Sequence, residues 1–354
     1  MVIGYCVKNL NNRITYNHKM VDKKYYTTIL SQTFSPCGNY LITGNNYGIL
    51  TVYNLKHELH SDNDLRDSEF SKDQSYGFEM IRKMQISSLA SGDKFLIVGG
   101  VGLIVGVDWD TIIGSNYEEN SKIEPLSISW SINIPAPKDS MLTVDVNCMI
   151  LNKEDNILYA GCGDNIVYAF NLECGDVIHK LEGHSDFIHS IDDLNDTISS
   201  ASEDGSVLFW DKRTKTFTSK IIPSSNPAIR RPDLGNWIGS VTITKDWMLC
   251  GGGTKLSLWN RSMAAPMTVY NTTEDSGIHV TKLMDESLYA GGCSKYFYQL
   301  SFTDEVMCKI ETSPVTVFSC VSQDSPFKVM CLAGSSNKID VCTNLNYKMT
   351  TLGL

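Results

Sequence analysis

Several features that would mark an enzyme or a membrane protein are missing from this sequence. No stretch approaches the ~18 consecutive apolar residues that a membrane-spanning helix needs, and the N-terminal residues lack the apolar core of a secretory leader. No HExxH, P-loop or GxSxG motif occurs. The seven histidines follow no repeat. We therefore expect no metal, no cofactor and no contact with a membrane.

Cysteine pairing is also missing. The eleven cysteines contain no CxxC pair, and Cys250, Cys331 and Cys342 stand in apolar runs. Cysteine in such runs acts as a small buried hydrophobe. An odd number of unpaired cysteines argues against a disulfide framework and predicts a soluble protein of a reducing, intracellular compartment.

Positive charge is in short supply. Lys and Arg total 30 against 40 Asp and Glu, which gives a formal net charge of −10. A polyanion would be repelled by most of such a surface, so we expect no obligatory direct contact with nucleic acid. The best local basic group, the pair Arg230 and Arg231, is too small to reverse this expectation.

Short alternating apolar runs, separated by glycine-rich turns, make up most of the chain and are typical of many short strands. The most informative stretch, residues 181–213, begins with Gly183-His184 and ends with Trp210-Asp211. Its Asp204-Gly205 pair is a tight-turn signal. This stretch resembles the WD repeat of β-propellers in order and spacing. The resemblance implies a hydrogen-bonded structural tetrad across the blade: His184, Ser200, Asp204 and Trp210.

A catalytic interpretation of His184, Ser200 and Asp204 is the alternative. Such a site would also need an exposed nucleophile and an oxyanion hole. The structural interpretation explains the polar residues directly, because a buried indole N–H and a buried carboxylate both need partners. We therefore predict no catalytic residues.

Looser copies of the repeat extend along the whole chain. Each has a turn, an apolar alternation, and a large or apolar residue at the position of Trp210; in chain order these residues are Tyr53, Trp109, Phe170, Trp210, Trp259, Leu300 and Cys342. Seven copies predict an all-β, seven-bladed WD-repeat β-propeller over residues 25–354, after an N-terminal arm, residues 1–24. Gaps longer than a blade of ~40–45 residues predict inserts near 55–80, 113–140 and 222–236. For the outer strand of the last blade we favour residues 347–354 over the N-terminal arm.

Four stretches resemble particular blades of the THO complex subunit 6 family. They are SQTFSPCGNYLITGNNYG (31–48), GHSDFIH (183–189), RPDLGNWIGSVTITKDWMLCGGGTKLSLW (231–259) and KVMCLAGSSNKIDVCTNLNYK (328–348). The resemblance implies a non-catalytic adaptor of the nuclear transcription–export complex, which couples mRNA synthesis and processing to mRNA export. It also implies docking on coiled-coil subunits of that complex and a contribution to its oligomerisation.

Candidate partner-binding residues gather in the loop 223–237. Arg230, Arg231 and Trp237 belong to the residue types that anchor interfaces, and Tyr47 in the first tight turn is a further candidate. A structural alternative stays open, in which Trp237 packs under its blade and Arg231 caps a carbonyl.

Two other functions compete with the adaptor. Trp210-Asp211-Lys212-Arg213 fits the Trp-Asp-x-Arg motif of WD-repeat substrate receptors of cullin-type ubiquitin ligases, although Asp211 and Arg213 also form a local turn pair in many WD repeats. A propeller hydrolase with a central metal would need carboxylates or histidines converging from several blades. The histidines show no such phasing.

Overall fold

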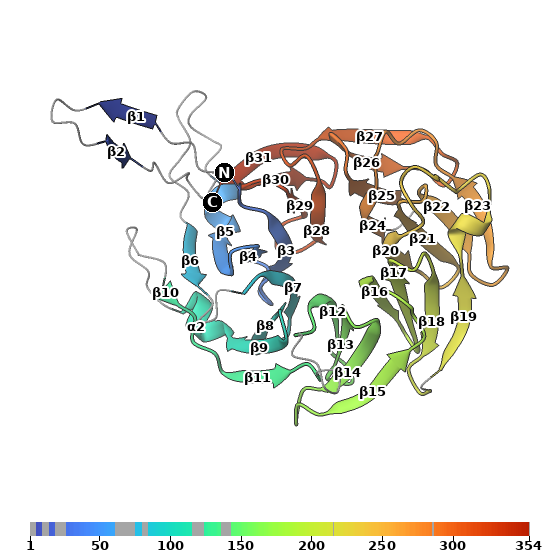
Figure 1. Cartoon of the computed structure of the whole chain (residues 1–354), viewed down its shortest axis with the longest axis horizontal. Helices are drawn as coiled ribbons and strands as arrows, with labels where there is room; N and C mark the ends of the chain where they lie inside the picture. Colours follow the sequence, from blue (N-terminus) through green and yellow to red (C-terminus); the bar gives the residue numbers. More distant parts are fainter. Residues whose placement is uncertain are drawn as a thin grey trace.

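Seven antiparallel sheets are arranged around a central axis in the computed structural model (Figure 1). The structure describes residues 5–8, 14–17, 26–60, 75–79, 84–114, 124–135, 143–214, 216–284 and 287–353. The sheets are the blades of a propeller, and each blade is built from strands that follow one another outward from the axis. The predicted all-β, seven-bladed propeller is therefore confirmed.

Blades 3 to 7 each consist of four consecutive antiparallel strands. From the axis outward, blade 3 contains β12 (Val146–Asn152), β13 (Ile157–Cys162), β14 (Ile166–Asn171) and β15 (Val177–Glu182), and blade 4 contains β16 (Ile188–Leu194), β17 (Thr197–Ser202), β18 (Val207–Asp211) and β19 (Phe217–Ile221). In the same order, blade 5 contains β20 (Ile238–Ile243), β21 (Trp247–Gly252), β22 (Ser257–Asn260) and β23 (Ala265–Val269), and blade 6 contains β24 (Ile278–Met284), β25 (Ser287–Gly292), β26 (Tyr296–Leu300) and β27 (Val306–Glu311). Blade 7 contains β28 (Val317–Gln323), β29 (Val329–Gly334), β30 (Lys338–Thr343) and β31 (Tyr347–Gly353).

The first two blades carry additions to this plan. Blade 1 contains β3 (Ile29–Phe34), β4 (Tyr40–Asn45), β5 (Ile49–Asn54) and β6 (Ser75–Glu79), and blade 2 contains β7 (Ile86–Ser91), β8 (Phe95–Gly100), β9 (Leu103–Asp108) and β11 (Trp130–Asn133). The short strand β10 (Glu124–Pro125) pairs in parallel with β6. The helices α1 (Leu55–His60) and α2 (Trp109–Ile113) follow β5 and β9, and the 3-10 helix η3 (Pro223–Ser225) lies between blades 4 and 5.

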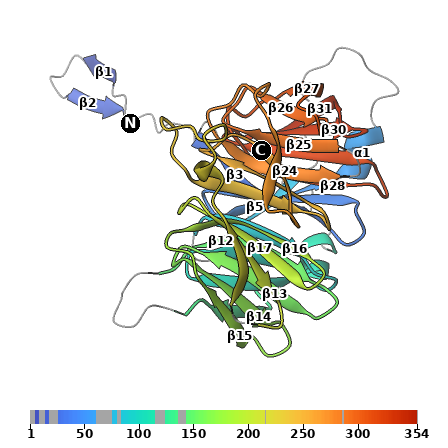
Figure 2. The same cartoon turned by 90° about the vertical axis from the view of Figure 1, so that its right-hand side faces the viewer.

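Ring closure uses the C-terminal strand. β31 pairs with β30 and is the outer strand of blade 7, so the run favoured from the sequence has this position. The N-terminal arm is described only at β1 (Tyr5–Lys8) and β2 (Ile14–Asn17), which pair with each other in a separate two-stranded sheet. Figures 1 and 2 draw this hairpin outside the ring.

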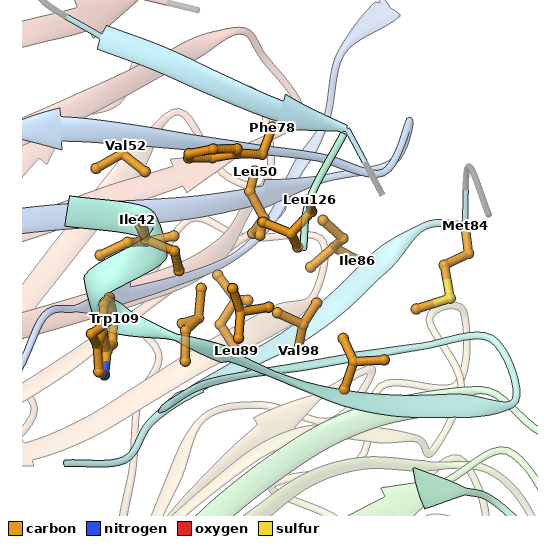
Figure 3. Close-up of a cluster of buried hydrophobic side chains, with 14 of the residues drawn as sticks. Ile42, Leu50, Val52, Phe78, Met84, Ile86, Leu89, Val98, Trp109 and Leu126 are labelled. Carbon is orange, nitrogen blue, oxygen red and sulfur yellow. The ribbon is translucent and has the colours of Figure 1, made fainter. Parts of the chain in front are cut away.

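Parts of two segments predicted as inserts belong to blades. Within 55–80, Leu55 and Phe78 are buried and β6 is the outer strand of blade 1; within 113–140, β11 is the outer strand of blade 2. Figure 3 shows Phe78 and Leu126 packed with side chains of blades 1 and 2. Within these two predicted inserts, residues 61–74, 80, 115–123 and 136–140 lie outside the described residues.

One predicted blade anchor is wrong. In blade 4, Trp210 pairs with Ile198, and the equivalent pair in blade 2 is Val107 with Leu96, so Val107 holds the position assigned to Trp109. The strand β9 ends at Asp108, whose side chain accepts the Asp110 N–H and caps α2. Trp109 is therefore the first residue of the helix, where its indole Nε1 donates to the Gly92 carbonyl at 2.9 Å.

Apolar side chains fill the seams between neighbouring blades. Each buried cluster draws from two adjacent blades, as in Figure 3 for blades 1 and 2. All the cysteines with described side chains are free, and burial raises the pKa of the Cys250 thiol to about 12, which fits its expected role as a small hydrophobe. Among the described residues no helix has the length and apolar character required to cross a membrane.

Blade 7 has a partly buried ion pair between its two outer strands. The Asp340 carboxylate on β30 is fully buried and lies 2.8 Å from the Lys348 ammonium on β31. It also accepts the Ser313 backbone N–H and hydroxyl, both at 2.6 Å. This arrangement links the outer strands of blade 7 to the loop that leads into it.

A buried carboxylate joins blades 4 and 5 and gives the fold a pH dependence. Asp192 on β16 accepts the Ile243 N–H of β20 at 2.7 Å. Burial raises the pKa of Asp192 to about 6. The backbone hydrogen bonds from Ile243 and Asp193 and the positive charge of Lys282 partly oppose this rise. Because the carboxyl ionises at lower pH in the unfolded chain, the contribution of Asp192 to stability falls as pH rises from about 4 toward 6–7.

We expect Asp192→Asn to remove this dependence. The stability of the variant relative to the wild type should increase by about 2 kcal/mol between pH 4.5 and pH 7. Urea denaturation of both proteins at the two pH values measures it, because other titrating groups cancel in the difference. An equal difference at both pH values would contradict the assignment.

Candidate functional site

The four residues of the predicted tetrad meet in blade 4. His184 lies in the loop before β16, Ser200 on β17, Asp204 in the turn after β17, and Trp210 on β18. The indole Nε1 of Trp210 donates to Ser200 Oγ at 2.8 Å. His184 Nε2 lies 2.8 Å from the same hydroxyl, and His184 Nδ1 lies 3.0 Å from Asp204 Oδ2.

Protons can be placed along this chain without conflict. Trp210 donates to Ser200, the Ser200 hydroxyl donates to His184 Nε2, and His184 Nδ1–H donates to Asp204, which requires the neutral Nδ1–H tautomer. Ser206 Oγ adds a further donor to Asp204 at 2.6 Å. The chain of hydrogen bonds joins the loop before β16 to β17 and β18. Ser200 and Trp210 are fully buried, so this group of residues presents no exposed nucleophile.

The Asp204 carboxylate is stabilised in its charged form. Burial opposes ionisation, but hydrogen bonds from His184, Ser206 and the Ser185 N–H outweigh it and hold the pKa of the carboxyl far below its usual range. Its contribution to stability is present at neutral pH and is lost only in strong acid.

All four candidate partner-binding residues lie on one face of the ring. This is the face where the innermost strands begin, and it also carries the turns between the second and third strands. Tyr47 is half-buried in the β4–β5 turn, where its N–H donates to Asn45 Oδ1 at 2.9 Å. Arg230 is exposed in the loop before β20. The structure does not bring these two residues together with Trp237.

Arg231 is engaged inside the protein. Its Nε donates to the Gly253 carbonyl at 2.8 Å, and its Nη2 donates to the carbonyls of Gly252 and Thr254, both at 2.9 Å. Its Nη1 lies 2.8 Å from Asp275 Oδ1. The guanidinium therefore fastens the loop 222–236 to blade 5 and to the segment before blade 6, as the structural alternative proposed.

Trp237 makes a hydrogen bond within its own loop, and its ring also faces a cavity. Its Nε1 donates to the Leu234 carbonyl at 2.9 Å. The half-buried ring lines a cavity of about 410 Å³ at the mouth of the central channel. Other residues around the cavity include His189, His279 and Phe318.

Sequence reasoning missed these other cavity residues. His189, His279 and Phe318 are the second residues of β16, β24 and β28, each at a register shift between the first and third residues of the strand. The signal in the sequence is an aromatic or imidazole side chain at the second residue of the innermost strand. It becomes visible only once the first residue of each of these strands is known.

The Arg213 guanidinium is paired with the carboxylate of Asp211, two residues before it. Its Nε and Nη2 donate to the two oxygens of Asp211 at 3.0 and 2.7 Å, and its hydrogen bonds lower the pKa of Asp211 to about 2. This is the turn pair common to WD repeats. Within the described ranges no group of three or more His, Cys, Asp or Glu side chains is placed to hold a metal ion.

Comparison with known proteins agrees with this geometry. Residues 175–211 match the family model described as WD domain, G-beta repeat. The WD40 β-propeller domain of Doa1 has the same fold with a TM-score of 0.66, at 10% identity, over 89% of this chain and 92% of that one. The fold and the polar chain of blade 4 thus define a WD-repeat β-propeller.

Relatives along almost the whole chain identify the family. THO complex subunit 6 of Drosophila melanogaster is 33% identical over 326 residues, which cover 92% of this chain and 89% of the relative. THO complex subunit 6 of Homo sapiens is 30% identical over 336 residues, which cover 93% and 94%. The chain belongs to the THO complex subunit 6 family, and the resemblance predicted from the sequence is confirmed.

Proposed function

We propose that this chain is a non-catalytic scaffold subunit of a nuclear THO complex. In this role it couples mRNA transcription and processing to mRNA export through protein–protein contacts. The observation that carries the proposal is the 30–33% identity, along 92–93% of the chain, to relatives that are named THO complex subunit 6.

The surface chemistry supports a protein-bridging role. A net charge of −10 disfavours obligatory RNA contact, and the Ser-His-Asp group of blade 4 is enclosed in the blade. We propose coiled-coil subunits of the complex as the direct partners, with the propeller, residues 25–354, promoting oligomerisation of the complex. The arm, residues 1–24, precedes this scaffold.

Affinity purification from nuclear extract tests the proposal. Tagged protein, treated with nuclease and analysed by mass spectrometry, is expected to recover the other THO subunits in stoichiometric amounts. Release of those subunits by nuclease would indicate bridging by RNA rather than by protein. Recovery of a cullin ligase in place of the THO subunits, with that recovery lost in an Arg213→Ala variant, would favour the other function. The chain would then be a WD-repeat substrate receptor of the ligase, with the same fold.

A further inference from the structure

A ring of seven equivalent positions surrounds the mouth of the central channel. The innermost strand of every blade has a register shift between its first and third residues. Such a bulge re-aims the side chain of the extra residue. The seven residues at this position all line the cavity of about 410 Å³: Leu30, Ser87, Asn147, His189, Gly239, His279 and Phe318.

Aromatic and imidazole side chains lie on only one side of this ring of positions. Blades 4 to 7 contribute a continuous arc of rings, in which the centroids of His189 and Trp237 are 6.3 Å apart and those of Trp237 and His279 are 5.1 Å apart. Phe318 extends the arc, 5.1 Å from His279. Blades 1 to 3 contribute an apolar side chain and short polar ones.

Trp237 takes the place that blade 5 leaves empty. The bulge residue of that blade is Gly239, and a Cβ there would lie 2.6 Å from the Trp237 ring. The indole is fixed by its bond to the Leu234 carbonyl and by near-parallel stacking on His279, at 27°. The aromatic arc is therefore held in place before any ligand arrives.

The charge of the cavity favours a cation. Among the described residues that line the cavity, Glu203 is the carboxylate and there is no Lys or Arg. Its Oε2 lies 2.8 Å from His189 Nε2, and its side chain is 42% exposed, so it keeps access to a ligand. Burial, with a smaller effect from His189, lowers the pKa of His279 to about 4, so the second imidazole is neutral at pH 7.

We propose that the channel mouth binds an arginine side chain presented by an extended segment of a protein partner. A planar guanidinium stacks on aromatic rings and donates paired hydrogen bonds to a carboxylate, and the arc and Glu203 offer both. A nucleic acid would bring phosphates to a cavity whose described lining has a carboxylate and no Lys or Arg. The proposal deepens the proposed function, because it names the chemistry of the segment that the scaffold receives.

Binding to the purified chain provides the test. The probes are three capped glycine heptapeptides whose central residue is arginine, lysine or citrulline, the neutral isostere of arginine, together with an oligouridine. We expect the arginine peptide to shift the indole N–H resonance of Trp237, with lysine weaker and citrulline and oligouridine without effect. Assignment of that resonance comes from Trp237→Phe.

Two variants and one control variant locate the site. Glu203→Gln and Phe318→Leu change exposed or half-buried side chains and should each weaken arginine binding roughly tenfold. Asp233→Asn removes one exposed carboxylate from the same face, outside the cavity, and should leave binding unchanged. Equal binding of arginine and citrulline peptides, binding of oligouridine at the mouth, or no peptide binding would each overturn the inference. Because the assay uses the isolated chain, these outcomes are separate from the copurification result.

Discussion

Trp210→Ala is expected to lower the free energy of unfolding by about 3–5 kcal/mol. The indole is fully buried, packs edge-on against Phe217 with centroids 5.8 Å apart, and donates to Ser200. Its truncation leaves a large cavity in the apolar seam between blades 3 and 4, where the indole packs. It also removes the donor at one end of the chain that continues through Ser200 and His184 to Asp204.

Two further variants separate packing from hydrogen bonding. Trp210→Phe keeps most of the ring volume but removes the N–H, so we expect a smaller loss of about 1–2 kcal/mol. Phe217→Ala, at a neighbouring ring that is 43% exposed, should cost less than Trp210→Ala. Urea denaturation measures all three. A Trp210→Ala protein within about 1 kcal/mol of the wild type would show that the polar chain and its packing do not hold blade 4 together.

The sequence contained enough to predict the ring and the tetrad of blade 4. The tetrad is readable because its members act within one repeat, at separations that the blade geometry fixes. Gly205, with φ +80°, marks the turn after β17, and a Cβ there would meet the Asn236 carbonyl at 2.9 Å. Local constraints of this kind are visible in a sequence because the residues that satisfy one another are close along the chain.

The outer strands of the first two blades could not be predicted as well. β6 and β11 are outermost among the antiparallel strands of their blades and follow long segments, so turn spacing does not locate them. β11 alternates one buried residue, Ile132, with exposed neighbours. Such a short pattern is indistinguishable from loop sequence until the strand beside it is known.

Long-range contacts explain why the sequence left two interpretations of Arg231 and Trp237 open. Arg231 and Trp237 have the composition of an interface anchor, yet the groups that Arg231 satisfies lie 21 to 44 residues further along the chain. The residues of the channel mouth come from seven blades. Only the closed ring brings such positions together, so no local pattern could decide between the two interpretations of Arg231 or assign His279 to a cavity.

Arg231→Ala is the second change for which we expect a large effect, a loss of about 3–5 kcal/mol. The guanidinium is 17% exposed and its partner Asp275 is 2% exposed. Removing it leaves the carbonyls of Gly252 and Thr254 without this donor and the Asp275 charge without its cation. Arg230→Ala is the matched control: this neighbour is exposed, so its loss should change stability by less than about 0.5 kcal/mol.

A double-mutant cycle identifies the source of the cost. If the unpaired carboxylate dominates, Asp275→Asn in the Arg231→Ala background should recover about 1–3 kcal/mol, although the same change in the wild type destabilises. Arg231→Lys retains the charge but cannot reach the three carbonyls and the carboxylate together, so it should lie between wild type and alanine. Equal stability of Arg231→Ala and Arg230→Ala would contradict the internal role and return Arg231 to the candidate partner-binding residues. A loss confined to Arg231→Ala makes this arginine the clamp that fixes the loop, including the Leu234 carbonyl to which Trp237 donates, and thereby the aromatic arc at the channel mouth.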